Sequence, residues 1–138
     1  MTTQRQHAFR NGIAPQLSTA GLVALRAALA SNDPRLLRGA CTMPPPLQCV
    51  QDWPVERCCP IGFAGWQGEG LTTVAEVEEH FARVCFEADE ALGEPAACRW
   101  FLNWWDTTPR EEARPLLLAE IEAELARRAP AALTTSAA

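Results

Sequence analysis

The sequence predicts an all-α protein, a single small domain that folds as an irregular orthogonal bundle of five or six helices. Three observations support this prediction. Apolar side chains recur at helical spacing in several long segments, and no segment of any length shows the alternation of apolar and polar residues that is typical of a strand. Proline-initiated starts with short connections between them favour crossing helices over a long parallel bundle.

The chain has 138 residues, of which 48% are hydrophobic, so it can bury the core of one compact domain. We expect residues 17–128 to form this domain. Residues 1–16 are polar and contain Asn11-Gly12 and Pro15, which predicts a flexible N-terminal arm. Residues 129–138 are expected to be a disordered C-terminal tail.

Two helices are predicted in the first third of the chain. The first covers residues 19–30 and is capped by Ser18 or Thr19. The second is short and covers residues 34–39, because Asp33 is a good N-cap and proline fits the first helical position.

A proline-rich connector and a short helix are expected next. Residues 42–56 contain three consecutive prolines and are predicted to be extended. Residues 59–67 could form a short helix that opens at Pro60, which places Cys59 at its N-cap. Gly62 and Gly65 would allow another element to pack closely against it.

The strongest helix prediction covers residues 74–92. Thr73 and Glu76 form the sequence pattern of a capping box, and Gly93 is the expected C-terminal stop. Apolar residues fall on one stripe of this helix and acidic residues fall largely off it.

Two further helices follow. Residues 95–105 are apolar on nearly every side, which predicts a short, central and buried helix. Residues 109–128 show a second capping pattern and a leucine-rich stripe, with a kink expected at Pro115. Taken together, the last three helices predict a core that contains Val77, Phe81, Val84, Phe101, Trp104, Leu118, Ile121 and Leu125.

The charge of the chain is divided unevenly. Residues 1–68 carry three acids and six arginines, whereas residues 69–138 carry fourteen acids and six arginines. An acidic second half predicts a surface that attracts a protein partner with a basic surface. The expected partner-binding residues are Trp105, as an exposed anchor, and the acids Glu76, Glu79, Glu87, Glu90, Glu120 and Glu124.

Several classes of function are disfavoured by the composition. A net charge of −5 argues against a general nucleic-acid binder, which needs clustered positive charge. The chain has no lysine, so it offers neither a phosphate-binding Walker loop nor a Schiff-base lysine. No nucleophile elbow is present, and we expect no catalytic residue. No apolar run is long enough to cross a membrane, and the polar N-terminus has no apolar signal region, which favours a cytoplasmic protein.

The six cysteines leave a second interpretation open. No pair has the spacing of a zinc ribbon, and we expect no cofactor, although loops could bring Cys41, Cys49, Cys58 and Cys59 together around a zinc ion. Cys59 at a helix N-terminus would be a reactive thiol. The alternative function is therefore a metal-binding or thiol redox protein centred on Cys58 and Cys59.

The favoured hypothesis is a small, acidic, non-enzymatic helical protein that acts by protein–protein interaction. Phage and mobile-element inhibitors of host enzymes include small acidic helical proteins of this kind, an analogy that rests on fold class alone. A homodimer also remains open.

Overall fold

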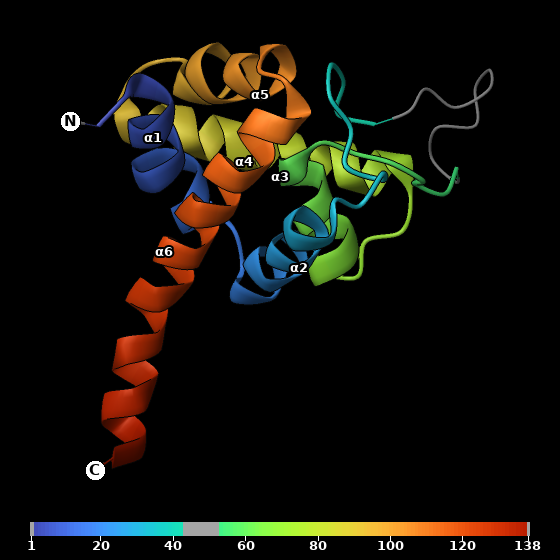
Figure 1. Cartoon of the computed structure of the whole chain (residues 1–138). Helices are drawn as coiled ribbons and strands as arrows, with labels where there is room; N and C mark the ends of the chain where they lie inside the picture. Colours follow the sequence, from blue (N-terminus) through green and yellow to red (C-terminus); the bar gives the residue numbers. More distant parts are fainter. Residues whose placement is uncertain (1, 43–52, 138) are drawn as a thin grey trace.

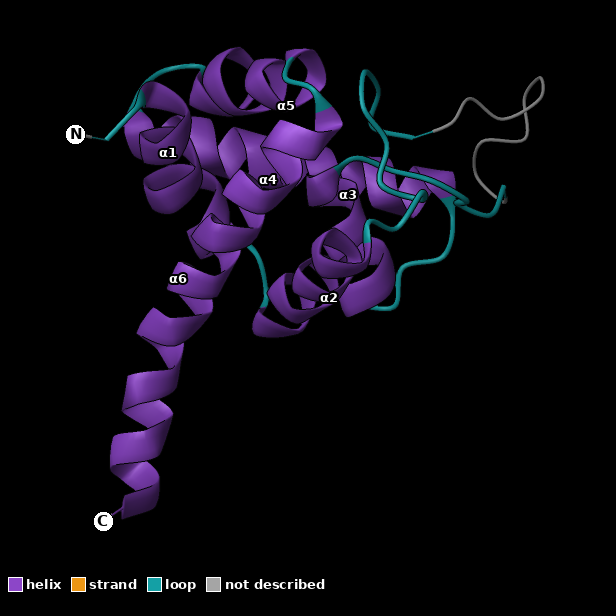
Figure 2. Ribbon diagram, viewed as in Figure 1, coloured by secondary structure: helices purple, strands orange, loops and turns teal. Residues whose placement is uncertain are grey.

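The computed structural model describes residues 2–42 and 53–137, and of residues 98 and 130–137 the backbone alone. Within these ranges the chain forms helices and three isolated bridges but no strand, which confirms the predicted all-α class (Figures 1 and 2). The helices are α1 (Gln4–Ala8), η1 (Phe9–Ile13), η2 (Ala14–Gln16), α2 (Thr19–Ser31), α3 (Pro60–Phe63), η3 (Ala64–Gly68), α4 (Val74–Leu92), η4 (Ala97–Leu102), α5 (Asn103–Thr107) and α6 (Arg110–Ala137).

Helix α4 lies at the centre of the structure and is bounded as the sequence predicts. The Thr73 hydroxyl accepts a hydrogen bond from the Glu76 backbone N–H at 3.2 Å, and the Glu76 carboxylate accepts one from the Thr73 N–H at 3.1 Å. Gly93 ends the helix in the left-handed conformation. Val77 and Val84 are buried in the core, whereas Phe81 is only partly buried and packs against it.

The N-terminal segment is part of the core, so the predicted flexible arm is wrong. Ala8, Phe9 and Ile13 are buried, and the Phe9 ring lies 5.3 Å from that of Phe101. Gly12 does not break the helical run. The lack of a side chain at this position lets η1 approach α4 closely. A Cβ atom at Gly12 would lie 3.3 Å from that of Ala88.

A partly buried ion pair joins this N-terminal segment to α6. Arg10 donates to both carboxylate oxygens of Glu120, at 2.6 and 2.8 Å, and the Gln6 amide donates at 3.2 Å. Glu120 is therefore buried and paired, and Glu124 is likewise buried against Arg127 and Arg128. The expectation that these two glutamates belong to an exposed acidic surface is wrong, because both carboxylates are covered and paired with arginines of the protein.

The predicted helix over residues 34–39 does not form. The backbone there pairs instead with the segment before α3: the Leu37 N–H donates to the Cys58 carbonyl at 2.8 Å, and the Cys58 N–H donates to the Arg35 carbonyl at 3.0 Å. Asp33 binds the Arg35 side chain and its backbone N–H. Tertiary pairing thus takes up the backbone groups that a short helix would have used.

Helices α3 and η3 pack unusually close to their neighbours, as the glycines predict. A Cβ atom at Gly65 would lie 2.7 Å from the His80 ring of α4. At Gly68 a Cβ atom would lie 2.3 Å from the Cα atom of Gly21 in α2, which is too short for any contact between carbon atoms. Glycine is therefore required where η3 crosses α2.

The two adjacent tryptophans of α5 exchange the roles that the sequence predicts. Trp105 is fully buried and its indole N–H donates to the Leu37 carbonyl at 2.9 Å, so it cannot be an exposed anchor. Trp104, predicted as core, is only partly buried. Phe101 and Trp105, which are both buried, are four residues apart and therefore lie on one helix face, which leaves Trp104 at the edge of the core.

Helix α6 crosses the molecule and extends beyond it (Figure 1). Leu117 and Ile121 are buried against the core, and Leu118 and Leu125 are partly buried beside it. The helix does not end near residue 128 but continues to Ala137. The backbone of the predicted disordered tail is thus helical, which its alanine-rich composition favours.

We predict that the two tryptophans differ in their contribution to stability. Trp105→Ala should lower the free energy of unfolding by about 3 to 5 kcal/mol, because it empties a fully buried site. Trp104→Ala should cost clearly less. Urea unfolding monitored by circular dichroism measures both values, and an equal or larger loss for Trp104→Ala would contradict the described packing.

We predict that the Glu120 ion pair makes stability depend on pH. The hydrogen bonds from Arg10 lower the pKa of Glu120 below its ordinary value. A lowered folded-state pKa stabilises the protein above about pH 4.3, the unfolded value, and the contribution is lost as the pH falls through the folded value. Glu120→Gln should therefore cost about 1 to 3 kcal/mol at pH 7 and less at pH 3.

The matched control is Glu122→Gln, since Glu122 is exposed on the same helix. Its effect on the free energy of unfolding should stay within about 0.5 kcal/mol at both pH values. If Glu120→Gln lowers the free energy of unfolding by the same amount at pH 7 and at pH 3, the charge of Glu120 contributes nothing to stability.

Candidate functional site

The exposed side of α4 carries four of the predicted partner-binding acids. Glu76, Glu79, Glu87 and Glu90 are all exposed, as the stripe pattern predicts. Phe86 lies among them with 66% of its surface exposed, the largest exposed fraction among the large hydrophobic residues that the structure describes. We call Glu79, Phe86, Glu87 and Glu90 the α4 surface.

A shallow hollow of about 480 Å³ lies at the Phe86 end of the α4 surface. Phe86, Glu87, Glu90 and Ala91 form its α4 side, and Gln16 of η2 forms the other. The hollow therefore combines an aromatic ring with two carboxylates and has no basic residue in its lining. This combination suits a ligand that carries both apolar and positively charged groups.

The acids of α4 differ in how they are engaged. Hydrogen bonds from the backbone N–H groups of Thr72 and Thr73 lower the pKa of Glu76, which is committed to capping the helix. In the described part of the chain, the carboxylates of Glu79, Glu87 and Glu90 form no hydrogen bond or ion pair. These three carboxylates are available to a partner at no cost to the fold.

A second hollow, of about 250 Å³, lies toward the start of α4 and is lined by Leu71, Glu76, Glu79, His80 and Arg83. His80 is buried there, and its Nδ1 atom lies 2.9 Å from the Arg83 guanidinium. Its Nε2 atom is buried, has no hydrogen-bond partner among the described residues and lies 3.9 Å from the Glu69 carboxylate. Burial lowers the pKa of His80, so the ring is neutral at neutral pH.

Three of the predicted cysteines meet at the start of α3. Cys59 caps this helix as expected, and its sulfur accepts a hydrogen bond from the Gly62 N–H at 3.5 Å. The Cys59 N–H donates to the Cys41 carbonyl at 2.9 Å, which brings the loop of Cys41 against α3. Cys58 is buried beside them. Cys49 lies outside the described residues.

The thiols of this cluster are electrostatically unequal. Burial by itself would raise the pKa of Cys59, but hydrogen bonds from the Cys41 thiol and from the N–H groups of Gly62 and Ile61 outweigh it and lower that pKa. The same hydrogen bond to Cys59, together with burial, raises the pKa of Cys41. Burial, and then the neighbouring Cys59, raises the pKa of Cys58. The interacting pair is therefore Cys41 and Cys59.

Sequence reasoning missed Phe86, although a signal was present. Phe86 is an apolar residue off the apolar stripe of α4, and such a residue on a polar helix face indicates a contact outside the fold. Trp105, Glu120 and Glu124 are buried and lie outside the α4 surface.

Three findings complete the description of the site. Over residues 2–42 and 53–137, no group of three or more His, Cys, Asp or Glu side chains is placed to hold a metal ion. In the same ranges, no helix combines the length and apolar character needed to cross a bilayer. Comparisons of the chain with protein-family models, with curated protein sequences and with solved structures find no match.

Proposed function

We propose that this protein is a non-enzymatic helical binding protein whose α4 surface docks a basic segment of a protein partner. The observation that supports this most directly is Phe86, a large aromatic side chain held 66% exposed among unpaired carboxylates. A ring that stays in water does not contribute the favourable free energy of burying apolar surface. A partner that covered the ring would gain this free energy on binding. Aromatic side chains are also enriched among the anchors of protein interfaces.

The surrounding acids would set the choice of partner and the speed of association. Carboxylates at a rim contribute little net affinity, but they accelerate the encounter with a basic surface and repel an acidic one. A second copy of this chain that docked through the same face would place like charges opposite each other. The α4 surface therefore favours a different, basic protein over a symmetric homodimer. Inhibition of a host enzyme in the cytoplasm is one form that such binding would take.

This proposal predicts the effect of charge reversal on the α4 surface. The triple variant Glu79→Arg, Glu87→Arg, Glu90→Arg should slow association with the partner at least about tenfold at low salt, because the attractive field is reversed. Phe86→Ala should instead speed dissociation. Both variants should remain folded, because exposed charges contribute little to the free energy of unfolding and the Phe86 ring is itself mostly exposed. The partner is captured from a lysate of the native host, and its rate constants are then measured by surface plasmon resonance.

The matched control reverses three exposed acids elsewhere, Glu56, Glu112 and Glu122, and so makes the same change in net charge. The control should associate within about threefold of the wild-type rate at moderate salt, because distant charges are screened. If both triple variants are slowed equally, net charge and not the α4 surface governs binding.

A second candidate function, thiol redox chemistry, is favoured by the hydrogen-bonded pair of Cys41 and Cys59. A thiolate at Cys59 would attack hydrogen peroxide, forming an S–O bond as the O–O bond breaks and hydroxide leaves. The Cys41 sulfur would then attack the sulfenic acid, forming the disulfide, and its proton would leave with hydroxide as water. For this candidate we therefore propose Cys41 and Cys59 as the reacting pair, in place of Cys58 and Cys59.

The corresponding prediction is that peroxide treatment of the native protein yields a disulfide between Cys41 and Cys59. Mass spectrometry of the digested protein would identify the linked peptides. Cys58→Ser should still form the bond, whereas Cys41→Ser should stop at the sulfenic acid of Cys59, which dimedone traps. A disulfide between Cys58 and Cys59, or none at all, would contradict this candidate.

A further inference from the structure

A groove of about 250 Å³ lies between α1 and the η4–α5 segment, and it shares no lining residue with the α4 surface or with the cluster of Cys41, Cys58 and Cys59. Its walls carry two indole rings, two guanidinium groups and three uncharged polar side chains. The lining residues are Thr3, Gln4, Arg5, Arg99, Trp100, Asn103 and Trp104.

Arg5 is the residue that indicates a ligand. Its guanidinium carbon lies 4.3 Å from the centre of the Trp104 ring, which fixes the plane of the group. Arg5 is partly buried, yet in the described part of the chain its side chain forms no hydrogen bond or ion pair. Burial lowers the pKa of Arg5. An anion that accepts hydrogen bonds from these free N–H donors would stabilise such a partly desolvated cation.

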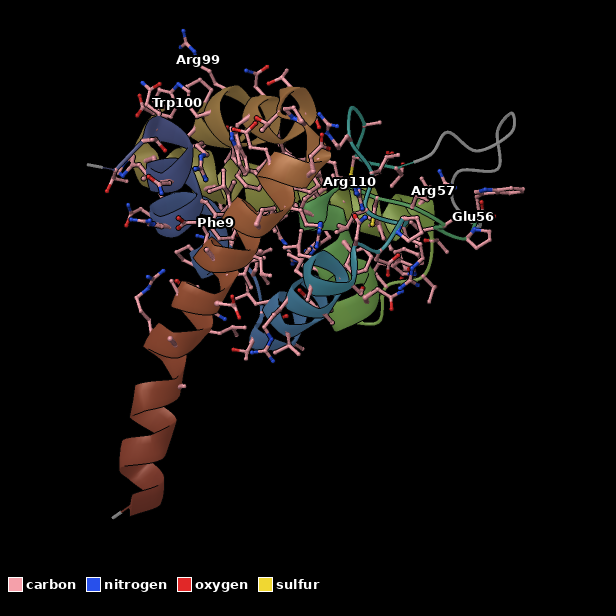
Figure 3. All side chains as sticks on the ribbon, in the orientation of Figure 1. Phe9, Glu56, Arg57, Arg99, Trp100 and Arg110 are labelled. Atoms are coloured by element: carbon pink, nitrogen blue, oxygen red, sulfur yellow. The ribbon has the colours of Figure 1, made fainter. Side chains whose placement is uncertain are left out.

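Arg99 and Trp100 supply the other half of the groove. Figure 3 shows Trp100 beside α1 and Arg99 projecting from the same end of the molecule. Trp100 is only partly buried, so part of its ring remains open to a stacking partner. Asn103, on α5, is exposed and offers an amide that can both donate and accept.

The groove is also positively charged, because it combines Arg5 of the arginine-rich first half with Arg99 of the acidic second half. None of its lining residues is acidic. The nearby carboxylate of Glu120, which raises the pKa of Arg5, is already bound by Arg10 and Gln6. In the part of the chain that the structure describes, no acceptor of the protein therefore takes up the N–H donors of Arg5 and Arg99.

We propose that this groove binds a nucleoside phosphate, with the phosphate at Arg5 and Arg99 and the base stacked on Trp100. Arginine binds phosphate oxygens through paired N–H groups, and indole rings stack on any base. The ligand would be a free nucleotide or the 5′-phosphorylated end of a single strand, which share this chemistry. A site for one nucleotide is compatible with the net charge of −5, which disfavours only binding along many phosphates. The proposal does not depend on the α4 surface.

The test is isothermal titration calorimetry of the full chain with adenosine 5′-monophosphate, adenosine, ribose 5-phosphate and inorganic phosphate. We expect adenosine 5′-monophosphate to bind with a Kd below about 1 mM and at least about tenfold more tightly than each fragment, because the base and the phosphate are held together. A 5′-phosphorylated oligodeoxythymidylate that binds more tightly than the nucleotide would identify a strand end as the source. Weaker binding of that strand would identify the free nucleotide.

Variants assign the binding to this groove. Arg5→Gln, Arg99→Gln and Trp100→Leu should each weaken binding of adenosine 5′-monophosphate about tenfold, the loss expected for one charge-assisted hydrogen bond or one stacked base. Arg57→Gln makes the same charge change on the opposite side of the molecule (Figure 3) and should leave the Kd unchanged. Circular dichroism checks the fold of each variant, and Arg99→Gln, at an exposed residue, serves if Arg5→Gln unfolds.

The proposal is overturned if adenosine 5′-monophosphate does not bind at 1 mM, or if Arg57→Gln weakens binding as much as Arg99→Gln does. It is also overturned if inorganic phosphate binds as tightly as the nucleotide, because the indole rings would then contribute nothing. Binding of a glutamate-rich peptide in place of the nucleotide would assign the groove to acidic proteins and would likewise overturn it.

Discussion

The placement of α6 depends on arginine side chains that donate to main-chain carbonyl groups of the N-terminal half. Leu29 lies in the last turn of α2 and Leu17 directly follows η2, where carbonyl groups lack the partners that a continuing helix would supply. Asp33 and Leu36 lie in the loop after α2. A guanidinium group can bind two such acceptors at once in a fixed plane, which a lysine ammonium cannot do. The absence of lysine therefore coincides with a structural use for arginine. The donors are Arg110 to Asp33 and Leu36, Arg114 to Leu29, and Arg128 to Ala14 and Leu17.

The elements that could be predicted from the sequence are those whose signals are local. Helix α4 has its cap, its stripe and its glycine stop within one segment, and α2 and the Cys59 cap of α3 are of the same kind. Residues 34–39 carried equally good local signals, but their backbone pairs with a segment about twenty residues away. The spacing of the aromatic residues did not decide between Trp104 and Trp105 either, because residues three and four positions after Phe101 both share a helix face with it.

The candidate sites divide in the same way. The exposure of Glu79, Glu87 and Glu90 follows from the periodicity of a single helix, and it was predictable. The burial of Glu120 was not, because its partner Arg10 lies 110 residues earlier in the chain. The groove around Arg5 and Trp104 joins equally distant segments, and no spacing pattern in one sequence reports such a contact. Electrostatic roles were thus predictable only where they depend on neighbours in sequence.

The packing of the N-terminal segment has a consequence for folding during synthesis. Ala8, Phe9 and Ile13 belong to segments that pack against α4, η4 and α6, and the carboxylate that binds the Gln6 amide lies 114 residues later in the chain. A ribosome that adds about 5 to 20 residues per second would leave these apolar side chains unpartnered for several seconds. The nascent chain therefore exposes part of its future core until the later helices have been synthesised, and contacts of this sequence separation slow folding.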